Sequence, residues 1–500
     1  MKISDIEKVL LEQQDELEAL EGEVLIHRPE EDLINLNSKL AQVVIGVRRS
    51  GKSTLCFNAL RKAGVHYAYA NFDDERLEEL ETKDLDNVLQ TLYKIYGKFD
   101  YLFLDEIQNI DGWPLFVNRL LRQRIHIIIT GSNAKLLSTE LATHLTGRHH
   151  KIELFPFSFK DWCSIKDVEY TRLTTKNKGL LSKAYEEYFR QGGFPELISG
   201  EENPKEYIST LIDNIISQDI KKRYKIRNID ALKRLAHHIL NETPTLIVKE
   251  TLQNIIGIKS ERTLGNYLMY LNQTYLISTI SKYSSRSRER ARNEKSYAID
   301  VAFMDKRENA FSGENLGWRL ETIVYLELLR RKAGTENDIY YYQGRSAEAD
   351  FVVCDGNKTL AVYQVSYDIA NNKTRKREIK GCIAGAKAHT NATANPAPEF
   401  TPITLDDANG LLSTVCIIIP ETPKAAPAKI AAQVRGKRLY KIIFANVDSV
   451  SYPNNTDNTF FHEICTDPIA TLIITLKNIN TTIKLMTALL FRRIQNFCQT

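Results

Sequence analysis

A glycine-rich turn, GVRRSGKS at residues 46–53, follows the apolar run AQVVI and precedes STLCFNALRKAG, a segment of helix-forming residues. Gly46 and Gly51 allow the tight turn that points backbone N–H groups at phosphate oxygens. Lys52 adds a positive charge for the β- and γ-phosphates, and the Ser53 hydroxyl can ligate Mg²⁺. The sequence therefore predicts a P-loop that binds ATP with Mg²⁺, through Gly46, Val47, Arg48, Arg49, Ser50, Gly51, Lys52, Ser53 and Thr54.

Residues 101–106, YLFLDE, predict a buried strand that ends in two carboxylates. Ligands bind at the carboxyl ends of the strands in open parallel sheets. Asp105 is therefore the second expected Mg²⁺ ligand, directly or through water. Glu106 is the expected catalytic residue, because it can orient and polarise the attacking water. An acid that only caps a strand end is the alternative, which the P-loop upstream disfavours.

Three further strands are predicted at residues 65–72, 124–133 and 150–157, with helical stretches between them. This alternation indicates an α/β fold, a doubly wound parallel sheet of the P-loop NTPase class. The strand at 124–133 ends in Gly-Ser-Asn. There Ser132 or Asn133 could bond the γ-phosphate or the attacking water, and we take Asn133 as a catalytic candidate. A simple Gly-Ser-Asn turn is the alternative.

Arg148, in the segment HLTGRHH, lies just before the last of these strands. In AAA+ ATPases this position commonly holds an arginine finger that reaches into a neighbour's nucleotide. Such an arginine accelerates hydrolysis by roughly 10³–10⁵-fold. A surface arginine paired with a carboxylate is the other interpretation. If Arg148 acts in trans, the protein must form a homo-oligomer to hydrolyse ATP well.

Composition gives little indication of a partner. Lys and Arg number 67 and Asp and Glu 63, so the net charge of +4 provides no strong general attraction to nucleic acid. The N-terminal residues predict an amphipathic helix rather than a signal peptide, and charged and amide residues interrupt the apolar stretch 468–491. The cysteines fit a reducing compartment, because they are scattered without a C-x-x-C pair. We therefore expect a soluble cytoplasmic protein without a membrane partner.

Residues 158–228 are expected to be helical, with a turn at GGFPE (192–196) and a basic run at 221–228. Residues 232–283 resemble a winged helix-turn-helix, with a turn at Gly257 and a second helix after Ser260, a suitable N-cap. The segment 285–295 follows, and its four arginines suit phosphate or minor-groove contact: Arg286, Arg288, Arg290 and Arg292. DNA is therefore one expected partner. A protein partner is the alternative, because the loop also contains glutamates.

A second set of polar residues begins after residue 300. Glu321 lies on a predicted helix, Asp350 in the strand-like AEADFVV and Gln364 in TLAVYQVSY. Their order resembles the PD-(D/E)xK nuclease core, in which acidic and amide groups bind Mg²⁺ and a lysine activates water. The lysine position, two residues after Gln364, is Ser366. Without that cation the alternative is a nuclease-like fold that serves only as a DNA or protein contact.

The motifs together resemble a large prokaryotic family that joins an AAA-type ATPase to a winged helix and a C-terminal PD-(D/E)xK nuclease-like domain of unknown function. The resemblance covers about residues 28–380 and implies ATP at residues 46–54, Mg²⁺ at Ser53 and Asp105, and hydrolysis aided by Glu106. Gln218 stands where the family often has a basic residue. The motifs are RPEEDL, GVRRSGKST, NFDDERL, YLFLDEIQNI, ITGSNAKLLS, LTGR, ELFPFSF, GGFPE, QDIKKRYKIRN, YAID, ENLG, ADFVV and YQVSYD.

These observations predict six regions. They are an N-terminal helix (1–27), an ATPase core (28–165), a helical lid or connector (166–228), a winged helix (229–299), a nuclease-like domain (300–390) and a tail with Pro/Ala-rich linkers (391–500). We expect an ATP-operated switch that acts on a partner such as DNA. The alternatives are an ATP-dependent nuclease of a mobile-element or defence system, and a scaffold that holds ATP with little hydrolysis.

Overall fold

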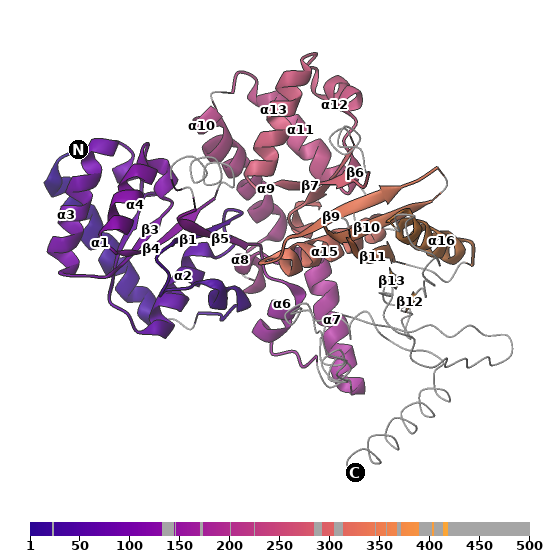
Figure 1. Ribbon diagram of the computed structural model, residues 1–500, viewed down its shortest axis with the longest axis horizontal. Coiled ribbons are helices and arrows are strands. Elements are labelled where there is room, and N and C mark those ends of the chain that lie inside the picture. Colours follow the sequence, from indigo (N-terminus) through magenta and orange to yellow (C-terminus); the bar gives the residue numbers. More distant parts are fainter. Residues whose placement is uncertain are drawn as a thin grey trace, which may run out of the picture. The chain divides into compact units, whose positions relative to one another are not determined.

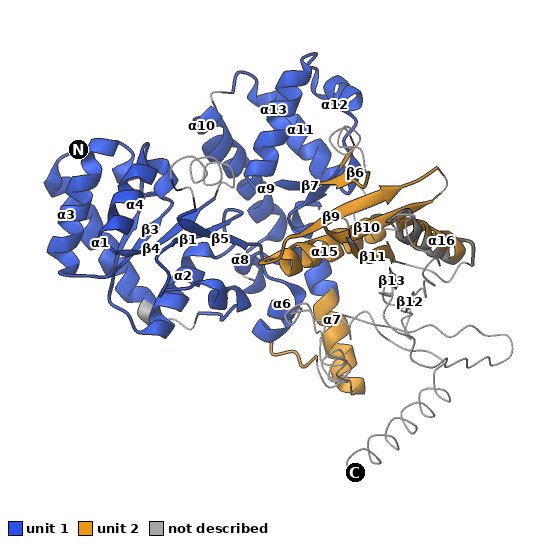
Figure 2. Ribbon diagram, viewed as in Figure 1, with its two compact units in different colours: residues 1–166, 186–279, 295–310 blue, residues 167–185, 280–294, 311–500 orange. Residues whose placement is uncertain are grey.

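The computed structural model describes residues 1–22, 25–132, 145, 147–170, 174–200, 202–224, 226–284, 293–304, 314–345, 347–356, 358–367, 372–389, 403–404 and 414–418. Contacts divide the chain into two units (Figure 2). Unit 1 comprises residues 1–166, 186–279 and 295–310, and unit 2 comprises residues 167–185, 280–294 and 311–500. Within the described ranges, no helix has both the length and the apolar character needed to cross a membrane.

A parallel sheet forms the centre of the N-terminal part of unit 1 (Figure 1). Its strands run in the order β2-β3-β4-β1-β5, and all four neighbouring pairs are parallel. The predicted parallel α/β sheet is therefore confirmed. β4 begins two residues later than predicted, because Arg124 turns the chain with a positive φ of 66°. The strands are β1 (Ala41–Gly46), β2 (Tyr67–Asn71), β3 (Tyr101–Asp105), β4 (His126–Gly131) and β5 (His149–Leu154).

Helices and short 3₁₀ turns connect these strands. Phe57 on a helix contacts the rings of Tyr69 and Phe103 on two strands, with centroids 5.1 Å away in each case, so one aromatic cluster joins helix and sheet. The helix that follows the P-loop ends at Gly64, whose φ of 62° suits a left-handed C-cap. The elements are α1 (Ile3–Glu21), η1 (Pro29–Leu33), α2 (Lys52–Ala63), η2 (Glu75–Leu77), η3 (Thr82–Asp84), α3 (Leu85–Tyr96), η4 (Ile107–Asn109) and α4 (Trp113–Arg122).

The N-terminal helix α1 is joined to β2 by one side chain. Gln13 Nε2 donates to the carbonyl oxygen of Asn71 at 2.9 Å, and the backbone N–H of Asn71 donates to Gln13 Oε1 at the same distance. Gln13 Nε2 also lies 3.2 Å from Asp74 Oδ2. A buried amide that bonds a backbone in both directions satisfies polar groups that would otherwise be costly to bury.

Arg28 holds the P-loop against the end of β5. It is 3 % exposed, and its guanidinium donates to the carbonyl oxygens of Ser50 at 3.1 Å and Phe155 at 3.0 Å. The same guanidinium lies over the ring of Phe157, 4.7 Å from the centroid. One buried cation therefore joins the P-loop to the segment that follows β5.

The rest of unit 1 is mostly helical, as the sequence predicts for residues 158–228. The loop before α8 is anchored by Asp300, which accepts from the backbone N–H of Gly193 at 3.0 Å and of Ala302 at 2.8 Å. β6 pairs antiparallel with β8. The elements are α6 (Phe159–Ile165), α8 (Pro195–Ile198), α9 (Pro204–Asn214), the π-helix η5 (Ile215–Lys221), α10 (Lys222–Tyr224), α11 (Ile229–Glu242), β6 (Thr245–Leu246), α12 (Lys249–Ile256), α13 (Glu261–Gln273) and η6 (Val301–Met304). Three elements have residues in both units: α7 (Thr175–Gln191), β7 (Ile277–Lys282) and β8 (Glu294–Ala298).

In its described residues, unit 2 contains an antiparallel sheet and two complete helices. The strands follow one another as β9-β10-β11-β13-β12, and the last residues of β7 pair in parallel with β9. Tyr325 of α15 stacks on Phe351 of β10 with centroids 5.9 Å apart, and Cys382 of α16 packs against Val362 of β11. The elements are α15 (Glu314–Lys332), β9 (Asn337–Gln343), β10 (Glu348–Asp355), β11 (Lys358–Ser366), α16 (Asn372–His389), β12 (Ile403–Thr404) and β13 (Thr414–Ile418).

The position of Arg28 predicts a large stability effect. Arg28→Ala should destabilise unit 1 by on the order of 3 kcal/mol, because two carbonyl oxygens lose a charged donor. The exposed Arg122 of α4 provides the matched control, and Arg122→Ala should stay within about 0.5 kcal/mol of the parent. Urea unfolding of the full chain measures both, and equal midpoints for the two variants would contradict the role of Arg28.

Candidate functional site

A cavity of about 380 Å³ opens at the carboxyl ends of β1 and β3 in unit 1. Its basic lining residues are Arg48, Arg49 and Lys52. Its acidic ones are Asp73, Asp105, Glu106 and Glu196, and the remaining lining residues are Gly51, Ser53, Thr54, Asn71 and Pro195. The P-loop residues and the two acids at the end of β3, predicted from separate motifs, therefore lie around one hollow.

The P-loop has the backbone geometry that its glycines suggest. Gly51 has φ 86° and Arg49 has φ 67°, both in the left-handed region. A Cβ at Gly46 would come within 2.0 Å of the carbonyl oxygen of Leu154, so only glycine allows β1 and β5 to approach there. Lys52 is buried, and its Nζ donates to the carbonyl oxygen of Val47 at 3.1 Å.

Asp105 is a buried carboxylate surrounded by hydroxyl donors. Thr130 donates to Oδ1, Tyr69 donates to Oδ2 at 3.3 Å, and the Ser53 hydroxyl also bonds the carboxylate. Burial and the neighbouring charge of Glu106 raise the pKa of Asp105 to about 6. The carboxylate therefore lies in a place where a cation would be strongly favoured.

Glu106 is held in an unusual conformation. Its φ is 51°, a left-handed value that costs a non-glycine residue roughly 1 kcal/mol or more, and such strain is concentrated at functional sites. Oε2 accepts from the backbone N–H of Ser132 at 3.1 Å and from Gln108, and Oε1 lies 3.7 Å from Lys52 Nζ. Burial alone would raise the pKa of Glu106, but Lys52 and these donors lower it, so the carboxylate stays ionised.

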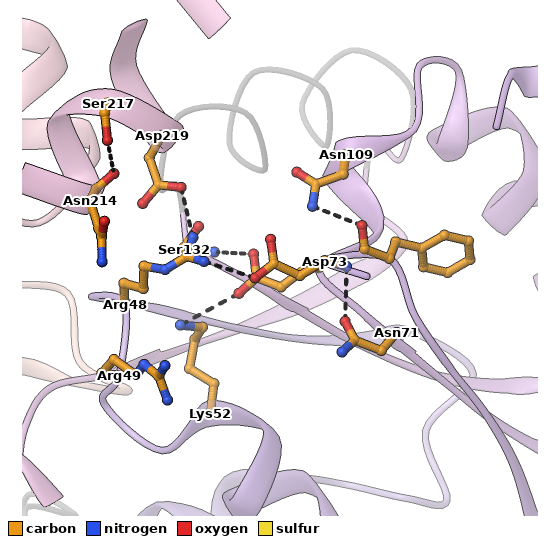
Figure 3. Close-up of polar contacts among 12 residues, drawn as sticks. Arg48, Arg49, Lys52, Asn71, Asp73, Asn109, Ser132, Asn214, Ser217 and Asp219 are labelled. Carbon is orange, nitrogen blue, oxygen red and sulfur yellow. Dashed lines mark hydrogen bonds and ion pairs between the residues drawn. The ribbon is translucent and has the colours of Figure 1, made fainter. Parts of the chain in front are cut away.

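The two arginines of the P-loop each contact an acid from outside the core sheet. Figure 3 shows Arg48 between Asp73 and Asp219, with nitrogen–oxygen distances of 2.9 Å and 3.1 Å. Arg49 lies 3.6 Å from Glu196 of α8, whose other oxygen accepts from the Tyr207 hydroxyl at 3.0 Å. The segments that carry Asp219 and Glu196 are therefore tied to the phosphate-binding loop by charge.

The remaining ATPase candidates lie in different places. Ser132 follows β4 and contacts Glu106 through its backbone, whereas Asn133 lies outside the described residues. Arg148 is exposed and precedes β5, and its carbonyl oxygen accepts from Ala41 at the start of β1. That is the amino-terminal edge of the sheet, opposite the P-loop, and six residues of strand span about 20 Å. Arg148 therefore cannot reach the cavity of its own chain.

The polar residues of unit 2 are partly brought together. Asp350 and Gln364 lie on the neighbouring strands β10 and β11, and Asp350 Oδ2 accepts from the backbone N–H of Val365 at 2.7 Å. Gln364 Nε2 donates to Glu378 of α16 at 2.7 Å, and Glu321 is buried on α15. Within the described parts of the chain, no group of three or more His, Cys, Asp or Glu side chains is arranged to hold a metal ion. The four loop arginines at 286–292 lie outside the described residues.

Several residues of the site had no predicted role. Asp73, Glu196 and Asp219 bind the P-loop arginines, Thr130 bonds Asp105, and Arg28 supports the loop. All five belong to short motifs whose order indicated the family, so the sequence marked the segments but not the contacts. The only signal for Asp219 in the sequence was an acid placed directly before a basic run, in QDIKKR.

The residues present fit a magnesium nucleotide. The left-handed turn at Gly51 and the buried Lys52 suit phosphate, and the oxygen donors Ser53 and Asp105, already in contact with each other, suit Mg²⁺. Burial and the neighbouring charge of Glu106 raise the pKa of Asp105, and a divalent cation bound by this carboxylate would favour its ionised form.

Two protein-family models match parts of this chain. Residues 38–163 match the family model of an AAA domain, and residues 182–310 match a family described as a domain of unknown function. Among solved structures, the Thermotoga maritima RuvB Holliday junction branch migration motor covers 48 % of this chain and 81 % of its own, with 18 % identity and a TM-score of 0.26. AMPPCP-bound DnaA from Aquifex aeolicus covers 52 % and 87 %, with 16 % identity and a TM-score of 0.22.

Two relatives match over most of their length. A Methanocaldococcus jannaschii protein named "Uncharacterized protein MJ1544" is 34 % identical over 423 residues, which cover 82 % of this chain and 93 % of the relative. A Haemophilus influenzae protein is 31 % identical over 344 residues, which cover 66 % of this chain and 83 % of the relative. The chain therefore belongs to the protein family of which MJ1544 is a member, and its residues 38–163 are an AAA-type ATPase domain.

Proposed function

We propose that this protein is a Mg²⁺-dependent ATPase that works as a nucleotide-operated switch. The observation that carries the proposal is the meeting of Lys52, Ser53 and the acids Asp105 and Glu106 around one cavity at the carboxyl edge of the sheet. These groups come from the P-loop and from β3, and together they can bind phosphate, hold a divalent cation and polarise water.

Each side chain has a task that follows from its surroundings. Lys52, buried and close to the loop backbone, binds the phosphate oxygens as a point charge. Ser53 and Asp105 would hold Mg²⁺, which would neutralise charge on the phosphates. Glu106 stays ionised and is fixed by Ser132 N–H, so it orients the attacking water. Gln108 and Thr130 keep the two acids in position.

Hydrolysis by this site is proposed to need a second copy of the chain. Arg148 is exposed at the edge of the sheet opposite the P-loop, so it serves as an arginine finger only in a neighbour's cavity. An oligomer in which the amino-terminal edge of one sheet faces the nucleotide of the next supplies the missing positive charge.

DNA is the partner that we propose for the switch, with a protein partner as the alternative. The sequence α11, β6, α12, α13, β7 and β8 follows the order of a winged helix, in support of the prediction for residues 229–299. Lys221 and Lys222, in the basic run before it, are exposed. The exposed first residues of α12 and α13 compensate each other's charge, since Lys249 Nζ lies 3.9 Å from a carboxylate oxygen of Glu261. Phosphate contact is therefore assigned to the basic run and the loop arginines.

Substitutions in the cavity should separate binding from turnover. Lys52→Ala should abolish ATP binding, whereas Glu106→Gln should bind ATP as the parent does and hydrolyse it roughly 10²–10⁴-fold more slowly, because the water loses its general base. A fluorescent ATP analogue measures binding and phosphate release measures turnover. Parent-like rates in both variants would overturn the assignment, whereas slow turnover of the parent that does not rise with protein concentration would favour a scaffold that holds ATP with little hydrolysis.

A mixing experiment tests the arginine in trans. Arg148→Ala and Lys52→Ala should each hydrolyse ATP poorly alone, the first for lack of a finger and the second for lack of a phosphate site. Mixed at equal concentration they should recover activity, because intact sites of the Arg148→Ala chains receive Arg148 from Lys52→Ala chains. Absence of recovery, together with a specific activity independent of protein concentration, would exclude action in trans.

The nuclease alternative makes an opposite prediction for plasmid DNA. We expect plasmid to stay intact after long incubation with the protein, ATP and Mg²⁺, because Ser366 replaces the lysine that activates water in nucleases of this type. Agarose electrophoresis checks this. Cleavage that disappears in Asp350→Ala and persists in the control variant Asp355→Ala, a half-buried acid at the end of the same strand, would establish the nuclease instead.

A further inference from the structure

The guanidinium of Arg48 is engaged from two sides by carboxylates. One nitrogen lies 2.9 Å from Asp73, which follows β2, and another lies 3.1 Å from Asp219 in the π-helix η5. Arg48 belongs to the P-loop and lines the cavity. A residue of the phosphate-binding loop is thus bonded to a segment 171 residues away in the sequence.

The two carboxylates differ in their contact with water. The Asp73 side chain is 43 % exposed and can turn into solvent, whereas the Asp219 side chain is 9 % exposed. Burial raises the pKa of Asp219 to about 6 although Arg48 opposes this effect. A buried carboxylate needs a paired cation. Without Arg48, Asp219 would be an uncompensated buried charge, which has a high free energy.

A phosphate in the cavity must share Arg48 with these acids. Guanidinium binds phosphate in the same forked manner as carboxylate, so the two anions compete for the same N–H groups. An anion that bonds Arg48 beside Asp219 would stand only two hydrogen-bond lengths from a carboxylate with little water between them. Glu106 and Asp73 already add negative charge at this point. Binding therefore weakens the hold of Arg48 on Asp219.

The segment that carries Asp219 has an uncommon helical geometry. Ile215–Lys221 forms a π-helix between α9 and α10, an arrangement that is uncommon and is frequent at functional sites. Its apolar side chains Ile215, Ile216 and Ile220 are buried, so a shift would be passed to their neighbours. Immediately after it, Lys222 forms an ion pair with Glu78, the residue that follows η2.

We propose that Asp219 is a positioning residue that competes with nucleotide phosphate for Arg48, so that filling of the cavity shifts the segment Ile215–Lys221. This inference rests on the proposed nucleotide site. It provides a route by which nucleotide binding changes the conformation of residues outside the ATPase core. Because coupling is reciprocal, whatever stabilises the released form of the segment also tightens ATP binding.

Nucleotide affinity tests the competition. Asp219→Asn should bind a fluorescent ATP analogue on the order of 5–50-fold more tightly than the parent, since a competing anion is removed. The control is Asp213→Asn on α9, an acid exposed to solvent and paired with Lys233, which should leave affinity unchanged. In an Arg48→Ala background, Asp219→Asn should have no effect. An equal gain in both backgrounds would indicate general repulsion and would overturn the competition.

The rate of trypsin cleavage after the exposed Lys221 and Lys222 measures a change in the conformation of the segment Ile215–Lys221. A non-hydrolysable ATP analogue with Mg²⁺ should change the cleavage rate several-fold in the parent and in Asp213→Asn. Asp219→Asn should show the nucleotide-bound rate without nucleotide. A parent that binds the analogue without any change in cleavage would refute the inference and leave the ATPase proposal intact. A parent that binds no analogue would refute both.

Discussion

In a phosphate-binding loop, the backbone N–H groups that bond the phosphate cannot also make hydrogen bonds within the loop. Contacts with other parts of the protein must therefore fix the conformation of the loop. In this protein Arg28 and Leu154 provide the restraint. Arg28 binds the carbonyl oxygen of Ser50 from behind the loop, and the approach of Gly46 to Leu154 leaves no space for a side chain. The strand, the turn and the start of α2 are thereby prepared for an anion.

Charge balance is the second condition for the site. Four carboxylates and three cations line the cavity, and Asp219 adds a further acid through Arg48. The pairs Lys52–Glu106, Arg48–Asp219 and Arg49–Glu196 keep these charges compensated. A triphosphate would enter a place where every cation already has a partner, so affinity would depend on exchange of partners rather than on free positive charge. This is why binding and conformation are expected to be linked.

Sequence patterns predicted the features that neighbouring residues form, but they did not predict contacts between residues far apart in the chain. The P-loop, the acids after β3 and the parallel sheet follow from short patterns whose residues are neighbours in the chain. The contacts of Arg28 with Phe155 and of Arg48 with Asp219 join residues 127 and 171 positions apart, and such contacts leave no periodic signal in the sequence.

Arg148 shows the same difference between local and long-range information. Its place before β5 was predicted, but only the strand direction shows which edge of the sheet it occupies. In unit 2, Asp350 and Gln364 meet through the β10–β11 register, and Glu378 joins them from α16.

The amide of Gln13 has one more consequence, which concerns how copies of this chain can associate. β2 is a border strand, and an unpaired border invites another strand to add to it. Gln13 bonds Asn71 in both directions, as a neighbouring strand would, and α1 lies along this side of the sheet. At the other border, β5 carries the ion pair of Lys151 and Glu153, and charged side chains on a border strand disfavour strand addition. Assembly through continuous β-pairing is thus disfavoured on both sides, which leaves the faces and ends of the core for any contact between subunits.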